Sequence, residues 1–174
     1  MKLFIIITLA AWSYYLAAGM QARSSTTASS TLNKRTADVR FNPGANGGGP
    51  QTRCKDITYT PGEPEDKIWG VDCDALITNT TDLHGLYMFQ DWKFDGDYTM
   101  LWSYGTCKIG VYRSDGKNSY TQVGDEDLRT ILTYCNKYLR SSYTMVKTVT
   151  GTMKCAGLQG AGNAAMNWTL RSET

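Results

Sequence analysis

The sequence predicts an α+β fold: a small, disulfide-stabilised antiparallel sheet of four to five strands with two helices packed on one face. Three observations predict it. Two segments have apolar residues at helical spacing, several others alternate with a period of two, and five cysteines are spread between Cys54 and Cys155 of the 174-residue chain. Hydrophobic residues make up 41% and charged residues 20%, which is the composition of a globular protein.

Residues 1–35 are interpreted as a leader rather than as part of the fold. A basic start is followed by an apolar run to Leu16 and then by small residues, which is typical of a secretory signal peptide at residues 1–19. The run is shorter than the ~20 residues that a membrane helix needs, so no membrane span is expected. Residues 20–35 form a Ser/Thr-rich pro-segment that ends in Lys34-Arg35, a dibasic processing site. We therefore expect a secreted, extracellular protein.

Residues 36–53 include the sequence NPGANGGGP and are expected to form a flexible arm, so that the ordered domain begins at Cys54. Residues 60–64 predict a turn. Residues 66–79 predict the first helix, because Trp69, Cys73, Leu76 and Ile77 recur at helical spacing.

Residues 86–123 predict strands, since the period changes to two. Large side chains alternate in residues 98–104, and the phase reverses after Gly105, which indicates a bulge or tight bend there. Residues 114–117 contain Asp-Gly and predict a hairpin turn.

The second helix is predicted to begin at Asp125, because three acidic residues precede an apolar stripe that includes Cys135. Residues 144–155 alternate again and predict a last strand. Residues 158–174, which begin in the glycine-rich stretch of residues 157–163, are expected to be a flexible tail.

The odd number of cysteines leaves one thiol without a partner in the chain, in a compartment that favours disulfides. Cys135 lies in the apolar stripe of the second helix, so we expect it to be the free, buried thiol. The other four allow three pairings. We favour Cys73–Cys107 and Cys54–Cys155, because the latter links the first ordered residues to the last.

Several motifs could have a catalytic or ligand-binding function, but a structural role explains each of them better. His84 is the single histidine and lies in a loop without a partnered nucleophile, so we expect a surface or capping role. Asp91, Asp95 and Asp97 lack EF-hand spacing and predict a polar turn rather than a Ca²⁺ site. The aromatic residues of 92–102 are expected in the core rather than in a base-stacking platform. The glycines of 157–163 lack the strand–helix context of a phosphate loop.

The charge of the mature protein also limits its partners. The whole chain has a net charge of +2, but the first 35 residues contain four basic and no acidic residues, and the remainder has 14 basic and 16 acidic ones. A mildly acidic domain predicts no nucleic-acid partner. A single histidine excludes multi-histidine metal sites, and we expect no cofactor. Asn79 and Asn167 begin N-glycosylation sequons, and both are expected to be used only because the chain is secreted.

A set of short motifs, in this order, resembles the fungal Ecp2 effector family, also called the Hce2 domain of necrosis-inducing factors. The resemblance spans residues 54–155, within an effector domain expected at residues 54–157, and it places four family cysteines on Cys54, Cys73, Cys107 and Cys155, with Cys135 as the extra one. The motifs are Asp72-Cys73-Asp74-Ala75-Leu76, YGTCKIGV at 104–111, VGDEDL at 123–128 and GTMKC at 151–155.

The resemblance implies a secreted effector of a plant-associated fungus that promotes virulence or provokes necrosis. It supplies no catalytic residues. From the leader, the disulfides and the lack of an assembled catalytic set, we expect a monomer that acts by binding to a host extracellular or membrane protein. Two alternatives remain open: a small secreted hydrolase such as a ribonuclease that uses His84 with an acidic partner, and an antimicrobial protein similar to killer toxins.

Overall fold

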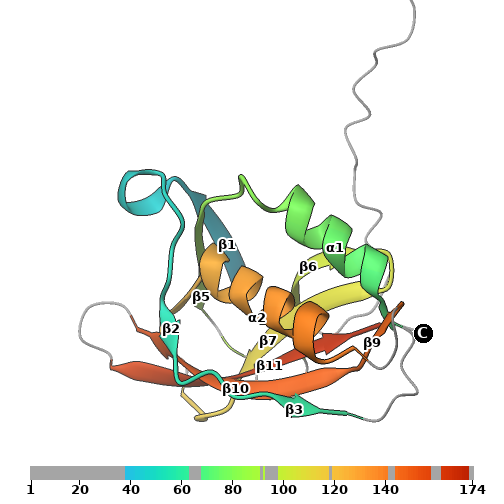
Figure 1. Cartoon of the computed structure of the whole chain (residues 1–174). Helices are drawn as coiled ribbons and strands as arrows, with labels where there is room; N and C mark the ends of the chain where they lie inside the picture. Colours follow the sequence, from blue (N-terminus) through green and yellow to red (C-terminus); the bar gives the residue numbers. More distant parts are fainter. Residues whose placement is uncertain are drawn as a thin grey trace, which may run out of the picture. The chain divides into compact units, whose positions relative to one another are not determined.

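The computed structural model describes residues 38–62, 68–90, 92, 98–117, 119–140, 144–157 and 162–172. These residues form an α+β domain, shown in Figure 1. Its elements in chain order are β1 (Asp38–Pro43), the 3₁₀ turn η1 (Ala45–Gly47), β2 (Cys54–Lys55), β3 (Thr60–Pro61), β4 (Ile68–Trp69), α1 (Gly70–Asn79), β5 (Gly85–Gln90), β6 (Thr99–Tyr104), β7 (Cys107–Arg113), β8 (Thr121–Gly124), α2 (Asp125–Tyr138), β9 (Met145–Val146), β10 (Val149–Ala156) and β11 (Asn163–Arg171).

The largest sheet is antiparallel and has the order β2-β10-β11-β7-β6, with β3 also paired to β10. The central strand β11 corrects the expectation of a flexible tail at 158–174, as far as residues 162–172 are concerned. Ala164, Met166, Trp168 and Leu170 alternate on the buried face of β11. The glycine-rich stretch before β11 concealed this alternation in the sequence.

A second antiparallel sheet has the order β1-β5-β8. Its edge strand β1 corrects the expectation of a flexible arm at 36–53, because Val39 pairs with Phe89 and Phe41 with Tyr87. Only two apolar residues alternate in β1, so its strand character depends on the partner β5. With the short β4–β9 pair, the described residues form three sheets and eleven strands, more than the four to five expected.

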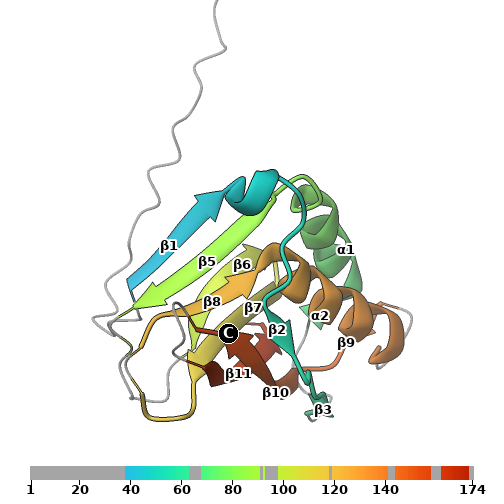
Figure 2. The same cartoon turned by 90° about the vertical axis from the view of Figure 1, so that its left-hand side faces the viewer.

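The two helices lie side by side on the same face of the largest sheet, as Figures 1 and 2 show. Helix α2 begins at Asp125, as predicted, and buries Leu128, Ile131, Leu132 and Cys135. Helix α1 begins at Gly70 rather than at residue 66, because Ile68 and Trp69 pair with β9 as strand β4. No helix in the described part of the chain is long and apolar enough to cross a membrane.

The connections also differ in part from the expectation. Gly105 forms the tight turn between β6 and β7 with a φ of +51°, as the phase reversal indicated, and an additional irregularity lies between Met100 and Trp102. Residues 114–117 form a bend, in which Gly116 has a φ of +67° and the Lys117 N–H donates to Oδ1 of Asp115 at 3.0 Å, but they do not close a β-hairpin. They connect β7 to β8, and these strands belong to different sheets.

Two disulfides join these elements. Cys54 bonds to Cys155 across the β2–β10 pair, and Cys73 of α1 bonds to Cys107 of β7. This is the pairing that the sequence favoured. The first bridge therefore fixes the β2 edge of the largest sheet, and the second fixes α1 on that sheet.

Candidate functional site

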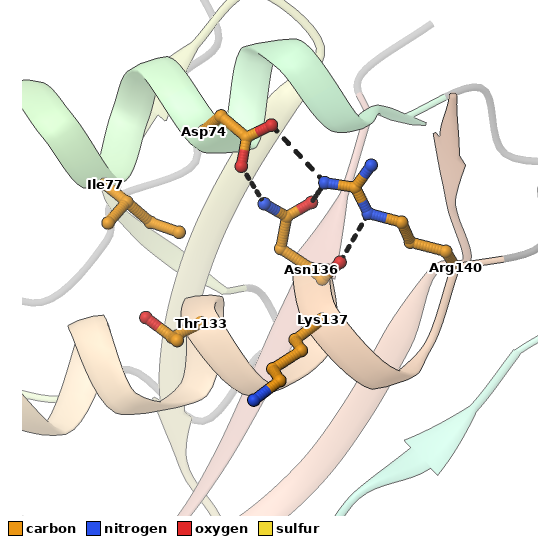
Figure 3. Close-up of a pocket in the computed structure, with 6 residues that line it drawn as sticks. All are labelled: Asp74, Ile77, Thr133, Asn136, Lys137 and Arg140. Carbon is orange, nitrogen blue, oxygen red and sulfur yellow. Dashed lines mark hydrogen bonds and ion pairs between the residues drawn. The ribbon is translucent and has the colours of Figure 1, made fainter. Parts of the chain in front are cut away.

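A pocket of about 490 Å³ lies between α1 and α2; we call it the interhelical pocket. Figure 3 shows Asp74 projecting from α1 toward Asn136 and Arg140, whereas Lys137 projects away from this cluster. Asn136 lies in the last turn of α2, and Arg140 follows the end of the helix and folds back on that turn, since its Nε donates to the backbone carbonyl oxygen of Asn136 at 2.5 Å. The lining residues are Asp74, Ile77, Thr133, Asn136, Lys137 and Arg140.

The polar groups of the interhelical pocket form a closed network. Asn136 donates from Nδ2 to Oδ1 of Asp74, and Arg140 donates from Nη2 to Oδ2 of Asp74 at 3.3 Å and to Oδ1 of Asn136 at 2.9 Å. The Asn136 side chain is buried, whereas Asp74 is exposed. The network therefore holds the two helices together and leaves Lys137 as the cation at the edge of the pocket.

A second pocket, of about 350 Å³, lies on the outward face of α2; we call it the tyrosine pocket. Tyr134 and Tyr138 lie one helical turn apart and have exposed fractions of 39% and 60%. Tyr134 stacks on Tyr59 with 4.0 Å between ring centroids, so its ring is held in place. The lining residues are Glu126, Arg129, Thr130, Thr133, Tyr134, Lys137 and Tyr138.

Further apolar side chains are exposed where α1 begins; we call Trp69, Val71 and Tyr104 the helix-start patch. Their exposed fractions are 45%, 67% and 47%. Thr106 joins the segments that carry them, because its Oγ1 accepts from the Trp69 backbone N–H at 2.8 Å and its own N–H donates to Asp72 at 2.8 Å. The two pockets and this patch together form what we call the helical surface.

Buried carboxylates fix the start of α2 beneath this surface. Backbone N–H groups of Gln51 and Gly85 donate to Oδ1 of Asp125 at 2.8 and 3.1 Å, and Arg129 donates to Oδ2 at 3.2 Å. Burial favours a higher pKa for Asp125, but the hydrogen bonds outweigh burial, so its pKa lies below 3.8. This ionised carboxylate therefore links three segments of the chain that are separate in sequence.

Asp127 also links separate segments of the chain, but its pKa is shifted in the opposite direction. Its Oδ2 accepts the backbone N–H groups of Arg53, Cys54 and Gly124 at 2.8, 3.1 and 2.8 Å, the last of which caps α2. Burial nevertheless dominates and raises the pKa of Asp127 above its ordinary value. The first bridged cysteine is thereby attached to the start of α2.

His84 lies beside this cluster. Its Nδ1 is 3.5 Å from Oδ2 of the buried Asp125, and 30% of its side chain is exposed. His84 is therefore one of the groups that surround the Asp125 carboxylate. The same contact orients the imidazole ring, so the two residues form a His–Asp pair.

The structure places the remaining predicted residues as follows. Trp92 and Trp102 are core residues with exposed fractions of 4% and 5%, and Trp102 donates from Nε1 to the Tyr87 hydroxyl at 2.5 Å. Cys135 is a buried free thiol. Lys34, Arg35, Asp91, Asp95 and Asp97 lie outside the described residues.

The two sequons have different surroundings. Asn79 is exposed at the end of α1, whereas Asn167 is half-buried in the central strand β11 and donates from Nδ2 to the Tyr112 hydroxyl at 2.5 Å. Thr169 of the second sequon is buried. Asn79 is therefore the more accessible acceptor in the folded domain.

Sequence reasoning did not find the helical surface. The signal was present in α2, because Tyr134 and Tyr138 lie one turn apart beside its apolar stripe rather than within it. Aromatic residues on the exposed face of an amphipathic helix indicate a contact surface. The pockets themselves require the placement of α1 next to α2.

Fold and surface together define a disulfide-stabilised α+β domain in which, among the described residues, two pockets are lined mainly by helix residues and large apolar side chains are exposed on α2 and around the start of α1. A family model, Hce2, described as "Pathogen effector; putative necrosis-inducing factor", matches residues 53–155. The match covers more than half of the chain, and the chain belongs to the Hce2 family of pathogen effectors. No curated protein matches the chain.

Proposed function

We propose that the protein is a secreted fungal effector that acts outside the cells of a plant host, by binding rather than by catalysis. Membership of the Hce2 family supports the effector role. The two disulfides suit an oxidising, extracellular environment.

The observation that carries the proposal is the exposure of large apolar side chains on the helical surface. Trp69, Val71, Tyr104, Tyr134 and Tyr138 are exposed by 39% to 67%. Aromatic residues supply much of the energy of protein interfaces when they enter a pocket of the partner. The proposed partner is a host extracellular or membrane protein, which the effector contacts as a monomer.

Leaf infiltration with the purified, disulfide-intact protein tests this proposal. The wild type is expected to cause necrosis, and a double variant Trp69→Ser/Tyr104→Ser is expected to reduce the lesion area at least by half. The Trp69 substitution keeps the hydrogen bond to Thr106, because that bond comes from the backbone.

A double variant Thr150→Ala/Lys154→Ala is the matched control, since both residues are exposed on β10 rather than on the helical surface. It should retain the necrosis of the wild type. Absence of necrosis with the wild type on every host tested, or equal loss with the control, would contradict the proposal.

A small secreted hydrolase, such as a ribonuclease, is the second candidate, and the His84–Asp125 pair favours it. The carboxylate orients the imidazole ring, and the partial exposure of His84 leaves it accessible to a substrate. Degradation of RNA by the wild type and its loss in His84→Ala would support this candidate. Equal activity of both proteins, or none, would exclude His84 as a catalytic residue.

A further inference from the structure

Three tyrosines and a tryptophan form a continuous aromatic ladder from the core to the surface of α2. Trp168 is fully buried, and Tyr59 meets its ring edge with centroids 5.3 Å apart. Tyr134 stacks on Tyr59 at 4.0 Å, and Tyr138 follows at 5.0 Å. These ring contacts restrict the exposed rings before any ligand binds. A ligand that packs on them therefore causes little further loss of side-chain conformational entropy.

The tyrosine pocket combines these rings with groups that form hydrogen bonds. Thr130 and Thr133 contribute hydroxyls, each of which can donate and accept. Arg129 and Glu126 form an ion pair at the same wall, which fixes a donor and an acceptor in place. The pocket therefore offers both an aromatic surface and hydrogen-bonding groups to a ligand of the size of a single small ring.

A sugar ring has the complementary chemistry. One face of a pyranose presents C–H groups that pack on an aromatic ring, and its hydroxyls need donors and acceptors around the edge. A volume of about 350 Å³ lies within the range of small-ligand pockets. We propose that the tyrosine pocket binds an oligosaccharide, with a sugar ring packed on Tyr134 and Tyr138.

The charge of the pocket specifies which oligosaccharide. Lys137 lines both the tyrosine pocket and the interhelical pocket, and its Nζ lies 4.9 Å from the centroid of the Tyr138 ring. Among the described residues, the ion pairs around these pockets join Arg129 to Glu126 and Asp125, and Arg140 to Asp74, and none includes Lys137. An exposed ammonium group beside an aromatic face favours a sugar that carries a carboxylate, so the ligand class is a uronic-acid oligosaccharide.

Isothermal titration of the mature, disulfide-intact protein with a galacturonic-acid hexamer tests the inference, and cellohexaose is the neutral probe of equal length. The acidic hexamer is expected to bind at least 10-fold more tightly than cellohexaose. Tyr138→Ala should weaken its binding about 10-fold, whereas Tyr138→Phe, which keeps the ring, should change it less than 3-fold. Lys137→Gln should reduce the preference for the acidic hexamer to less than 3-fold.

Tyr120→Ala is the matched control, because Tyr120 is a partly exposed tyrosine before β8, outside both pockets and the helix-start patch, and its variant should bind like the wild type. Thermal unfolding of each variant checks that it is folded. The inference is overturned if neither hexamer binds saturably, if both bind equally, or if Tyr138→Ala and Tyr120→Ala weaken binding alike. Leaf necrosis is a separate readout, so failure of the proposed effector function leaves this binding result intact, and the reverse also holds.

Discussion

Asp125 is a buried, ionised carboxylate whose stabilising contribution depends on pH. Its hydrogen bonds with Gln51, Gly85 and Arg129 hold its pKa below the ordinary value of 3.8. A lowered pKa in the folded state contributes stability above the unfolded-state pKa, and this contribution disappears as the pH falls through the folded-state pKa. We therefore expect Asp125→Asn to cost roughly 3 kcal/mol of unfolding free energy at pH 7 and clearly less at pH 2.

Urea unfolding of the wild type and Asp125→Asn at both pH values measures this difference. Only the difference between the two proteins is diagnostic, because the neighbouring Asp127 has a raised pKa and responds to pH in the opposite sense. A difference that stays constant from pH 7 to pH 2 would contradict the assignment.

Cys135 is a residue whose reactivity follows from burial. Its side chain is inaccessible, and burial raises the pKa of its thiol from 9.0 to about 12. Because the thiolate is the reactive form, we expect no reaction with a disulfide reagent at pH 8 in the native protein and one reactive thiol after denaturation. The raised pKa stabilises the fold below pH 9, and this contribution is lost as the pH rises from 9 toward 12. Rapid native labelling would show that Cys135 is exposed.

At the scale of elements, Gly151 determines how closely β10 approaches its neighbours. A Cβ atom at this position would lie 2.0 Å from the carbonyl oxygen of Thr58 and 2.5 Å from the Trp168 ring. Gly151→Ala is therefore expected to cost about 3 kcal/mol, since backbone and a buried ring must move. Gly49→Ala, whose added Cβ meets nothing within 4 Å, should stay within ±0.5 kcal/mol. Equal urea midpoints for both variants would contradict this placement of β10.

The elements also differ in how much of them the sequence could predict. Helix α2 carries its own signals, an acidic first turn and the stripe of Leu128, Ile131 and Leu132, so its prediction was correct. Strand β1 has only Val39 and Phe41 as apolar residues, and its order comes from pairing with β5, which local sequence does not encode. The exposed aromatic residues of the helical surface could be recognised in the sequence. Its interhelical pocket could not, because it depends on the packing of α1 against α2.

At the scale of the whole domain, the folded structure depends on links between the first and second halves of the chain. Asp127 of α2 accepts hydrogen bonds from the backbone N–H groups of Arg53 and Cys54, while Cys54 of β2 bonds to Cys155 of β10. The family match ends at Cys155, but the central strand β11 follows it and pairs with both β10 and β7. The folding unit is therefore larger than the matched region, and a fragment that ends at Cys155 would lose the middle of its largest sheet.

The two disulfides stabilise this unit unequally. Their cysteines are separated by 101 residues in Cys54–Cys155 and by 34 residues in Cys73–Cys107. In the chain-entropy model, closing these loops contributes about 4.7 and about 3.8 kcal/mol, so the longer loop is worth about 1 kcal/mol more. We expect the double variant Cys54→Ala/Cys155→Ala to have a lower urea midpoint than Cys73→Ala/Cys107→Ala. Each variant replaces two fully or nearly buried sulfur atoms, so the packing losses are similar and the difference reports on the loops. The reverse order of midpoints would show that the attachment of α1 to the sheet matters more for stability than the closure of the chain.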